Sequence, residues 1–139
     1  MLENARFTVA THILTLLAYG KGQRMTSSEI AASVNTNPVV IRRVLGQLRR
    51  TGLVESRGGA GGGWLLARPP EDINLKDVLL ATNPSLSFPM HPHEPNPNCP
   101  VGRSIQRVLA GHYEEAQRAM LAYFERVTIA ELLQEVIEV

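Results

Sequence analysis

Cysteine is almost absent from this chain of 139 residues, which contains a single one, Cys99. One thiol cannot form a disulfide within the chain, so a disulfide-stabilised secreted scaffold is excluded. Aromatic residues make up only 5% of the sequence, and no apolar run approaches the roughly 18 residues that cross a bilayer. We therefore expect a globular domain with one core, located in the cytoplasm and without a membrane span.

Catalytic motifs are also lacking. The sequence shows no paired carboxylates suited to a cleft, no nucleophile elbow and no nucleotide-binding loop, and its one cysteine has no assigned base. We predict that the chain is not an enzyme.

Positive charge gathers in the first half of the chain. Residues 1–68 carry nine Lys or Arg and three acidic residues, a net charge of +6. Residues 69–139 carry five Lys or Arg and ten acidic residues, a net charge of −5. Such asymmetry favours a polyanionic partner for the first half. Charge alone leaves a solvated basic face equally open.

Two short helices are predicted inside the basic half. Thr26–Glu29 fits a capping box ahead of the first, and Asn37 can cap a second that begins with Pro38 and ends at Gly52. A helix over 4–19 precedes them and is apolar nearly all round, so we expect it to be covered on more than one side.

The second of these helices has two chemically different faces. One is an apolar stripe that must face the core, formed by Ile41, Val44, Leu45 and Leu48. The other presents Val39, Arg42, Arg43, Gly46 and Arg50, with Gln47 at its margin. A major-groove reader requires such a face: arginine bonds guanine, an amide such as Asn37 or Gln47 bonds adenine, and valine meets a thymine methyl. An ordinary surface helix with arginines is the alternative.

A glycine-rich hairpin follows. Leu53–Ser56 and Trp64–Leu66 read as short strands, and the segment between them contains five glycines after Arg57. Without side chains the tip can approach phosphates through its N–H groups, which is typical of a DNA-binding wing. A nucleotide-binding loop is disfavoured because no Lys-Ser/Thr pair follows, whereas a plain flexible hairpin stays open.

The second half of the chain predicts a dimer. A short helix capped by Asn74 leads to a proline-rich loop, and a long helix over 101–127 carries an apolar stripe wider than one small domain should cover. Thr128 and Glu131 repeat the capping box before a last helix. We expect a homodimer, with the division 1–82 DNA-binding domain, 83–100 loop and 101–139 dimerisation helices. Packing of the long helix within its own subunit is the alternative.

These motifs, in the order Ser28-Glu29-Ile30-Ala31, Leu48-Arg49-Arg50-Thr51-Gly52-Leu53-Val54 and Arg57 to Ala67, resemble the Rrf-two (Rrf2) family of winged-helix regulators, the IscR and NsrR group. The resemblance implies a mainly α (α+β) winged helix-turn-helix and a dimeric transcription factor, usually a repressor, that reads an imperfect palindrome in double-stranded DNA. The predicted DNA-binding residues are Ser28, Asn37, Val39, Val40, Arg42, Arg43, Gln47, Arg50, Arg57, Gly58, Gly59 and Gly61. A winged-helix module that only contacts proteins is the alternative.

The sensing chemistry departs from that family. Many relatives hold an iron–sulfur cluster with three closely spaced cysteines, and one thiol cannot do so, so we predict no cluster and no other cofactor. Cys99 begins the long helix beside Arg103, where it could act as a thiol sensor, although a merely structural cysteine is at least as consistent. Sensing of a small-molecule effector, whose identity the sequence does not give, is the other possibility. His91 and His93 are weak candidates for a metal site, because their spacing fits no established one.

Overall fold

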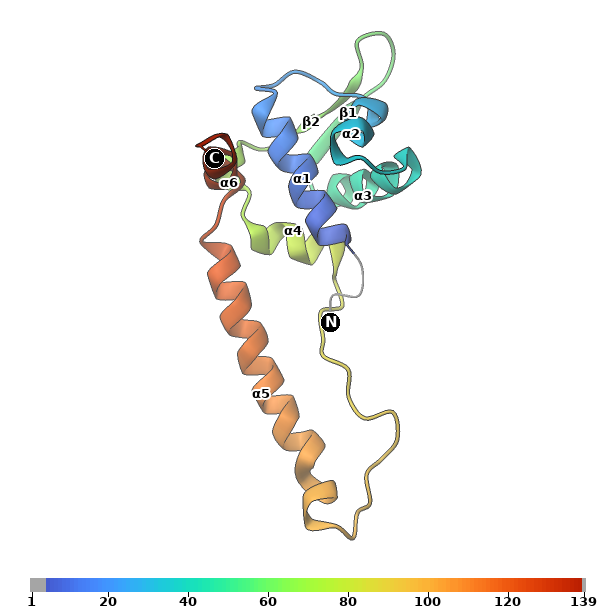
Figure 1. Cartoon of the computed structure of the whole chain (residues 1–139), viewed down its shortest axis with the longest axis vertical. Coiled ribbons are helices and arrows are strands. Elements are labelled where there is room, and N and C mark those ends of the chain that lie inside the picture. Colours follow the sequence, from blue (N-terminus) through green and yellow to red (C-terminus); the bar gives the residue numbers. More distant parts are fainter. Residues whose placement is uncertain (1–4, 139) are drawn as a thin grey trace.

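The computed structural model describes residues 5–138 and is mainly helical, with one two-stranded antiparallel sheet. It confirms the predicted class, a winged helix-turn-helix followed by a long helix (Figure 1). The elements in chain order are α1 (Arg6–Tyr19), α2 (Ser27–Val34), α3 (Pro38–Arg50), β1 (Val54–Arg57), β2 (Gly63–Leu66), η1 (Pro70–Asp72), α4 (Leu75–Thr82), α5 (Pro100–Glu125) and α6 (Ile129–Glu138). The predicted start of the first helix at residue 4 lies outside the described residues.

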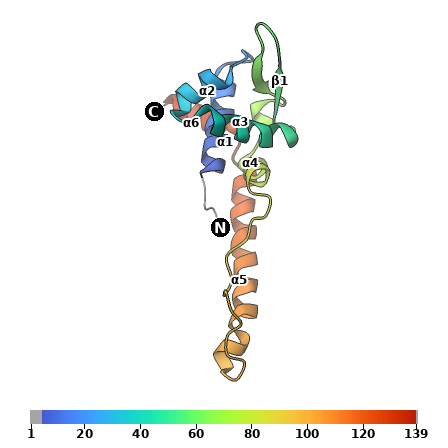
Figure 2. The same cartoon turned by 90° about the vertical axis from the view of Figure 1, so that its right-hand side faces the viewer.

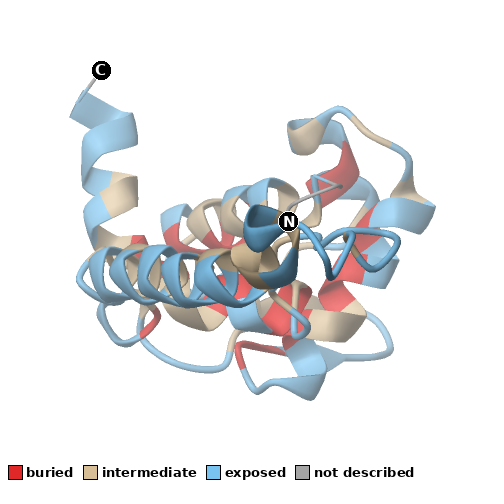
Figure 3. Ribbon diagram, turned by 90° about the horizontal axis from the view of Figure 1, so that it is seen from below, coloured by how far each residue is buried: buried red, intermediate tan, exposed pale blue. Residues whose placement is uncertain are grey.

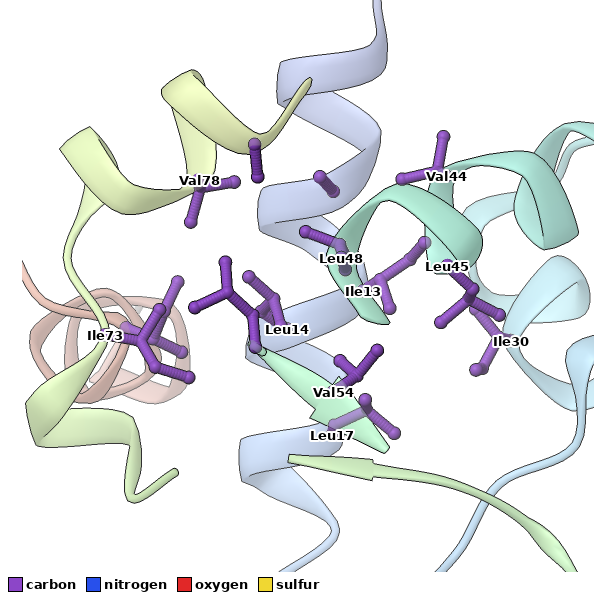
Figure 4. Close-up of a cluster of buried hydrophobic side chains, with 14 of the residues drawn as sticks. Ile13, Leu14, Leu17, Ile30, Val44, Leu45, Leu48, Val54, Ile73 and Val78 are labelled. Atoms are coloured by element: carbon purple, nitrogen blue, oxygen red, sulfur yellow. The ribbon is translucent and has the colours of Figure 1, made fainter. Parts of the chain in front are cut away.

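The hydrophobic core is built around α1, which packs against α3, α4 and α6. Figure 4 shows aliphatic side chains from these helices and from β1 pointing toward one another. The largest fully buried side chains are Ile13, Leu14, Ile30, Ile41, Leu45, Leu48, Leu53, Ile73, Leu79, Ile129, Val44 and Val54. The prediction that the first helix is covered on more than one side is confirmed.

Both predicted N-caps of the helix-turn-helix are present. The Asn37 side chain accepts a hydrogen bond from the Val39 N–H at 2.8 Å, and Pro38 occupies the first helical position. The Thr26 hydroxyl accepts from the Glu29 N–H at 3.1 Å. The return bond predicted from Glu29 to the Thr26 backbone is wrong, because its carboxylate accepts from the Thr26 hydroxyl instead.

Helix α3 ends at Arg50, two residues before Gly52, the residue that the sequence predicts will stop it. This residue has φ 78°, a left-handed conformation that glycine adopts without steric cost. The Gly52 N–H donates to the Arg49 carbonyl at 3.0 Å, and the Leu53 N–H donates to the Leu48 carbonyl at 2.9 Å. This Schellman pattern turns the chain from α3 directly into β1.

Reciprocal caps begin α4 and α6. The Asn74 side chain accepts from the Asp77 N–H at 2.9 Å, and the Asp77 carboxylate accepts from the Asn74 N–H at 3.2 Å. At α6 the Thr128 hydroxyl accepts from the Glu131 N–H at 3.1 Å, and the Glu131 carboxylate accepts from the Thr128 N–H at 3.4 Å. The cap by Asn74 and the box at Thr128 and Glu131 are as predicted, whereas the return bond from Asp77 was not predicted.

Helix α6 returns to the winged domain. The Ile129 N–H donates to the Ile73 carbonyl at 2.9 Å, the Leu75 N–H donates to the Val127 carbonyl at 2.9 Å, and α6 packs on α1 and η1. The predicted division grouped this helix with the dimerisation unit over 101–139. In the structure the start of α6 contributes to the core of the winged domain through Ile129.

Helix α5 projects away from the winged domain (Figure 1). The loop between α4 and α5 runs back along it and is held by two contacts. The Phe88 ring stacks on Tyr113 with centroids 4.6 Å apart, and the His91 N–H donates to the Gln106 side chain at 3.0 Å. Figure 2 shows the loop beside α5 from a second direction. One face of the helix is thus covered by its own chain.

The rest of α5 is open. The structure describes every residue of this helix, and none of them is buried (Figure 3). Val101 is 67% exposed, Val108 47% and Tyr123 57%. Within residues 5–138, no helix has the length and apolar character needed to span a membrane.

We expect Ile129→Ala to lower the free energy of unfolding by about 2–5 kcal/mol, because Ile129 is fully buried and its truncation leaves a cavity. Ile137→Ala on the same helix is the matched control, since Ile137 is 56% exposed, and should change stability by no more than about 0.5 kcal/mol. Urea unfolding followed by circular dichroism measures both. Equal effects of the two substitutions would contradict the docking of α6 in the core.

Candidate nucleic-acid interface

The outward face of α3 carries exposed valines and arginines. Val39 is 53% exposed and Val40 38%, and Arg42, Arg43 and Arg50 are exposed as well. The predicted stripe on the other face is buried, with Ile41, Val44, Leu45 and Leu48 each at 0% exposure. Burial of that stripe forces the arginines outward, since a helix repeats every 3.6 residues.

The polar residues predicted beside these arginines are placed differently. The Asn37 side-chain oxygen Oδ1 accepts a hydrogen bond from the Val39 N–H, so the helix cap uses one of its two acceptor positions. The Gln47 side-chain oxygen Oε1 is buried and has no hydrogen-bond partner among the described residues. Ser28 is exposed on α2, which packs against α3. The side chains of the arginines and valines of this face are exposed and take no part in the N-terminal cap of α3.

The wing is a hairpin of β1 and β2 in the register Arg57↔Gly63. At its tip Gly59 has φ 80° and Gly61 φ 73°, both in the left-handed region that glycine enters freely. The tip extends beyond the rest of the domain, on the side where α3 lies (Figure 1). The tip thus presents backbone without side chains at Gly59 and Gly61 on the same side of the domain as α3.

The remaining glycines of the wing serve different purposes. A Cβ on Gly62 would collide with the Arg57 carbonyl oxygen, and one on Gly63 would collide with the Met25 carbonyl oxygen. The fold itself therefore requires these two glycines. Gly58 is different, because no described atom lies within 4 Å of the place its Cβ would occupy and its φ is not positive. Nothing in the described fold demands glycine at this position.

Two arginines missed by the sequence reading hold the wing in place. The Arg49 guanidinium lies over the Trp64 ring, 5.8 Å from its centroid, and the Arg24 side chain donates to the Gly61 carbonyl at 3.3 Å. Met25 extends the sheet, since its N–H donates to the Trp64 carbonyl at 3.1 Å and its carbonyl accepts from the Trp64 N–H at 2.8 Å. The wing is thereby tied both to α3 and to the segment before α2.

The cations of this surface form no ion pair with an acidic side chain of residues 5–138. Across residues 5–138 the ion pairs are Arg68–Asp77, Lys76–Glu125 and Arg118–Glu115. Six exposed arginines of the helix-turn-helix and wing take no part in these ion pairs: Arg24, Arg42, Arg43, Arg49, Arg50 and Arg57. A group of unpaired cations on one rigid unit attracts phosphates and releases their counterions.

A family model described as Rrf2, an iron-dependent transcriptional regulator, matches residues 4–135. The chain belongs to the Rrf2 family. YwnA of Bacillus subtilis (strain 168), named as an HTH-type transcriptional regulator, is 44% identical to this Rrf2 protein over 119 residues, which cover 84% of this chain and 86% of YwnA. The HTH-type transcriptional regulator NsrR of Halalkalibacterium halodurans is 31% identical over 125 residues, 87% of this chain and 82% of NsrR.

The fold of this Rrf2 protein also matches solved structures. A crystal structure described as a transcriptional regulator from Lactobacillus plantarum has a TM-score of 0.78 at 27% identity, with 95% of this chain and 89% of the other covered. The family resemblance inferred from the motifs is confirmed, and the chain is a DNA-binding transcriptional regulator.

Iron belongs to the description of the family, but the donors of this Rrf2 chain do not fit an iron–sulfur cluster. Cys99 is its only cysteine, and no three His, Cys, Asp or Glu side chains gather as metal ligands in residues 5–138. Such clusters are held by several cysteine thiolates. His91 and His93, the weak metal candidates, are exposed in the loop.

Cys99 is exposed at the N-cap position of α5. The backbone N–H groups of Gly102 and Val101 face the sulfur and lower the pKa of the Cys99 thiol below its ordinary value. The contact is not a cap hydrogen bond of normal geometry. Negative charge is favoured there because a helix N-terminus carries partial positive charge.

Gly62→Ala should destabilise the wing of this Rrf2 regulator by about 1–3 kcal/mol, because the added methyl group meets backbone that cannot move freely. Gly58→Ala, four residues earlier, should leave stability within about 0.5 kcal/mol of the parent. Trp64 is the only tryptophan and lies on β2, so its fluorescence during urea unfolding reports on the wing in both variants. A stable Gly62→Ala variant with unchanged Trp64 emission would contradict this account.

Cys99 should react with iodoacetamide at lower pH in the folded chain than in the unfolded chain. A lowered pKa means that the thiolate forms earlier as the pH rises, so the midpoint of the rate against pH shifts downward on folding. The same chain in urea is the reference, and Cys99→Ser controls for reaction at other residues. Coincident midpoints would show that the helix start does not act on the thiol.

Proposed function

We propose that this Rrf2 regulator binds an imperfect palindrome in double-stranded DNA as a homodimer and acts as a repressor. Each copy places α3 in the major groove and its wing against the neighbouring backbone or minor groove. The observation that carries the proposal is the continuous set of unpaired arginines on α3 and the wing, held as one unit by Arg49 over Trp64.

The base-reading residues are proposed to be Arg42 and Arg43, with Val39 and Val40. Arginine pairs in bidentate fashion with guanine, and an exposed valine suits the thymine methyl group. Asn37 keeps a secondary role because its oxygen caps α3. The other predicted residues, Ser28, Gln47 and Arg50, flank this set and are assigned to backbone contacts.

The wing supplies contacts that carry no sequence information. Arg57 offers a cation at the start of the hairpin, and Gly58, Gly59 and Gly61 leave the tip without side chains. Gly58 supports this role most directly, since open space surrounds it in the chain alone. A closely approaching phosphate backbone gives a reason for glycine there.

The homodimer is proposed from the open face of α5. Val101, Val108 and Tyr123 are all more than 45% exposed, on a different face from Tyr113, which the loop covers. Exposed apolar side chains along one helix face mark a contact surface. A helix of 26 residues is about 39 Å long, enough to separate two winged domains that read half-sites about 34 Å apart.

The sensing half is proposed to work without a cluster and without catalysis. The donor set argues against iron held by one chain, so purified protein should show no iron-dependent visible absorption. Cys99 remains the proposed thiol sensor, through its exposed sulfur at the start of α5. The cytoplasmic location expected from the sequence is part of this proposal, because the chromosome of a bacterium lies there.

Selection from random duplex DNA, followed by binding titrations, tests the DNA-reading assignment. Arg42→Ala or Arg43→Ala should relax discrimination by about 1–3 kcal/mol at one base step per half-site. Arg57→Ala should weaken binding to all sequences evenly and reduce the salt slope of the dimer by about 2, because one phosphate contact is lost in each subunit. Arg107→Ala, an exposed arginine on α5, is the matched control and should change neither.

The salt dependence distinguishes DNA binding from a module that only contacts proteins. A dimer that neutralises about eight phosphates gives a log–log slope near −7. Binding that is independent of salt and of duplex sequence would reject the DNA-binding assignment in favour of protein contact. Weakening by Gly58→Ala without loss of stability is expected if the wing tip approaches the backbone.

A further inference from the structure

A cleft of about 480 Å³ lies between the end of α1 and strand β2, where the chain continues toward η1. In Figure 1 this region is on the opposite side of α1 from α3. Its inner wall is apolar, formed by the buried residues Leu17 and Ala18 together with Leu66 of β2. Its volume is that of a small-molecule site, roughly 300–1,000 Å³.

Two cations are among the residues that line this cleft, Lys21 after α1 and Arg68 after β2. Among the described residues that line it, none is acidic. The Arg68 guanidinium has one ion pair, with Asp77 at 3.6 Å, which leaves most of its five donors free. The Lys21 ammonium has no ion pair among residues 5–138. An apolar wall between two cations is complementary to an amphipathic anion.

The backbone at Lys21 supports a role for its side chain. Lys21 has φ 51°, in the left-handed region where glycine and asparagine are favoured and lysine is not. Among the described residues, one other non-glycine residue has a positive φ. It is Asn35, and asparagine suits that conformation. Glycine would fit position 21 with less strain, so the fold does not account for lysine there.

We infer that this cleft binds a small organic anion, a carboxylate or sulfonate carried on an apolar body. The anionic group lies between Lys21 and Arg68, and the apolar body lies on Leu17 and Leu66. Charge-assisted hydrogen bonds orient the ligand, and burial of its apolar part supplies most of the affinity.

Occupancy of the cleft acts on the base of the wing. Leu66 pairs with Val54, and Leu65 pairs with Glu55 of β1, so a ligand on this strand joins the wing to α1. In this inference the wing has two orientations that differ in DNA affinity. A ligand that binds the protein more tightly in one orientation shifts the population toward that orientation. The resulting change in DNA affinity is limited by the ratio of the ligand's affinities for the two orientations. This regulatory step rests on the proposed DNA-binding function, whereas binding of the anion does not.

Fluorescence titration of the full chain with 8-anilinonaphthalene-1-sulfonate tests the binding site. The probe joins a sulfonate to an aromatic body, and its uncharged counterpart N-phenyl-1-naphthylamine has nearly the same body. The sulfonate probe should bind saturably, one per chain, and about 10-fold more tightly than the neutral probe. Lys21→Gly and Arg68→Gln should each remove about this 10-fold preference, and Arg107→Gln should not.

Two results would overturn the inference. One is unchanged affinity for the sulfonate in both Lys21→Gly and Arg68→Gln, and the other is equal affinity of the parent chain for the two probes. Lys21→Gly relieves backbone strain, so it should fold, and a thermal unfolding curve checks this. In a separate arm, saturating sulfonate should shift DNA affinity in the parent but not in a variant that combines Lys21→Gly with Arg68→Gln. Absence of DNA binding by the parent would reject the proposed function and leave the titration result intact.

Discussion

Burial of one stripe of α3 determines what the DNA-reading half can present. Each fully buried aliphatic side chain contributes about 1.5–3 kcal/mol, and Ile41, Val44, Leu45 and Leu48 are all at 0% exposure. Rotation of α3 about its axis would expose these side chains, so the orientation of the helix is fixed by the core. The arginines need no partner within the chain to point outward, because the hydrophobic stripe behind them sets their direction.

Local signals explain why much of this fold could be predicted from the sequence. Asn37 with Pro38 and Gly52 define the two ends of α3 through bonds between residues at most five positions apart. The glycine run identified the wing for the same reason, since conformational freedom is a property of the residue itself. The family motif coincides with these segments, which is why the residues led to the family.

Contacts between distant segments could not be predicted in this way. The sequence does not distinguish Arg49 from the other arginines of α3. Its contact with the Trp64 ring becomes apparent only in the folded chain. Periodicity shows that the last helix has an apolar face. It does not show whether Ile129 on that face packs in the core of its own chain, as the structure has it, or against a second subunit. Asn37 was predicted as both a cap and a base reader, and the geometry shows that the cap uses one of the two acceptor positions of its side-chain oxygen. Such competition becomes visible only when all partners are placed.

The junction of α5 with the winged domain has a mechanical consequence. A rod about 39 Å long that tilts by about 5° at one end moves its other end by about 3 Å, close to the rise of one base pair. The Ile129–Ile73 hydrogen bond ties the chain that follows α5 to the body that carries α3. In the proposed homodimer, a small tilt at this joint would therefore change the spacing of the two winged domains relative to the helical repeat of DNA.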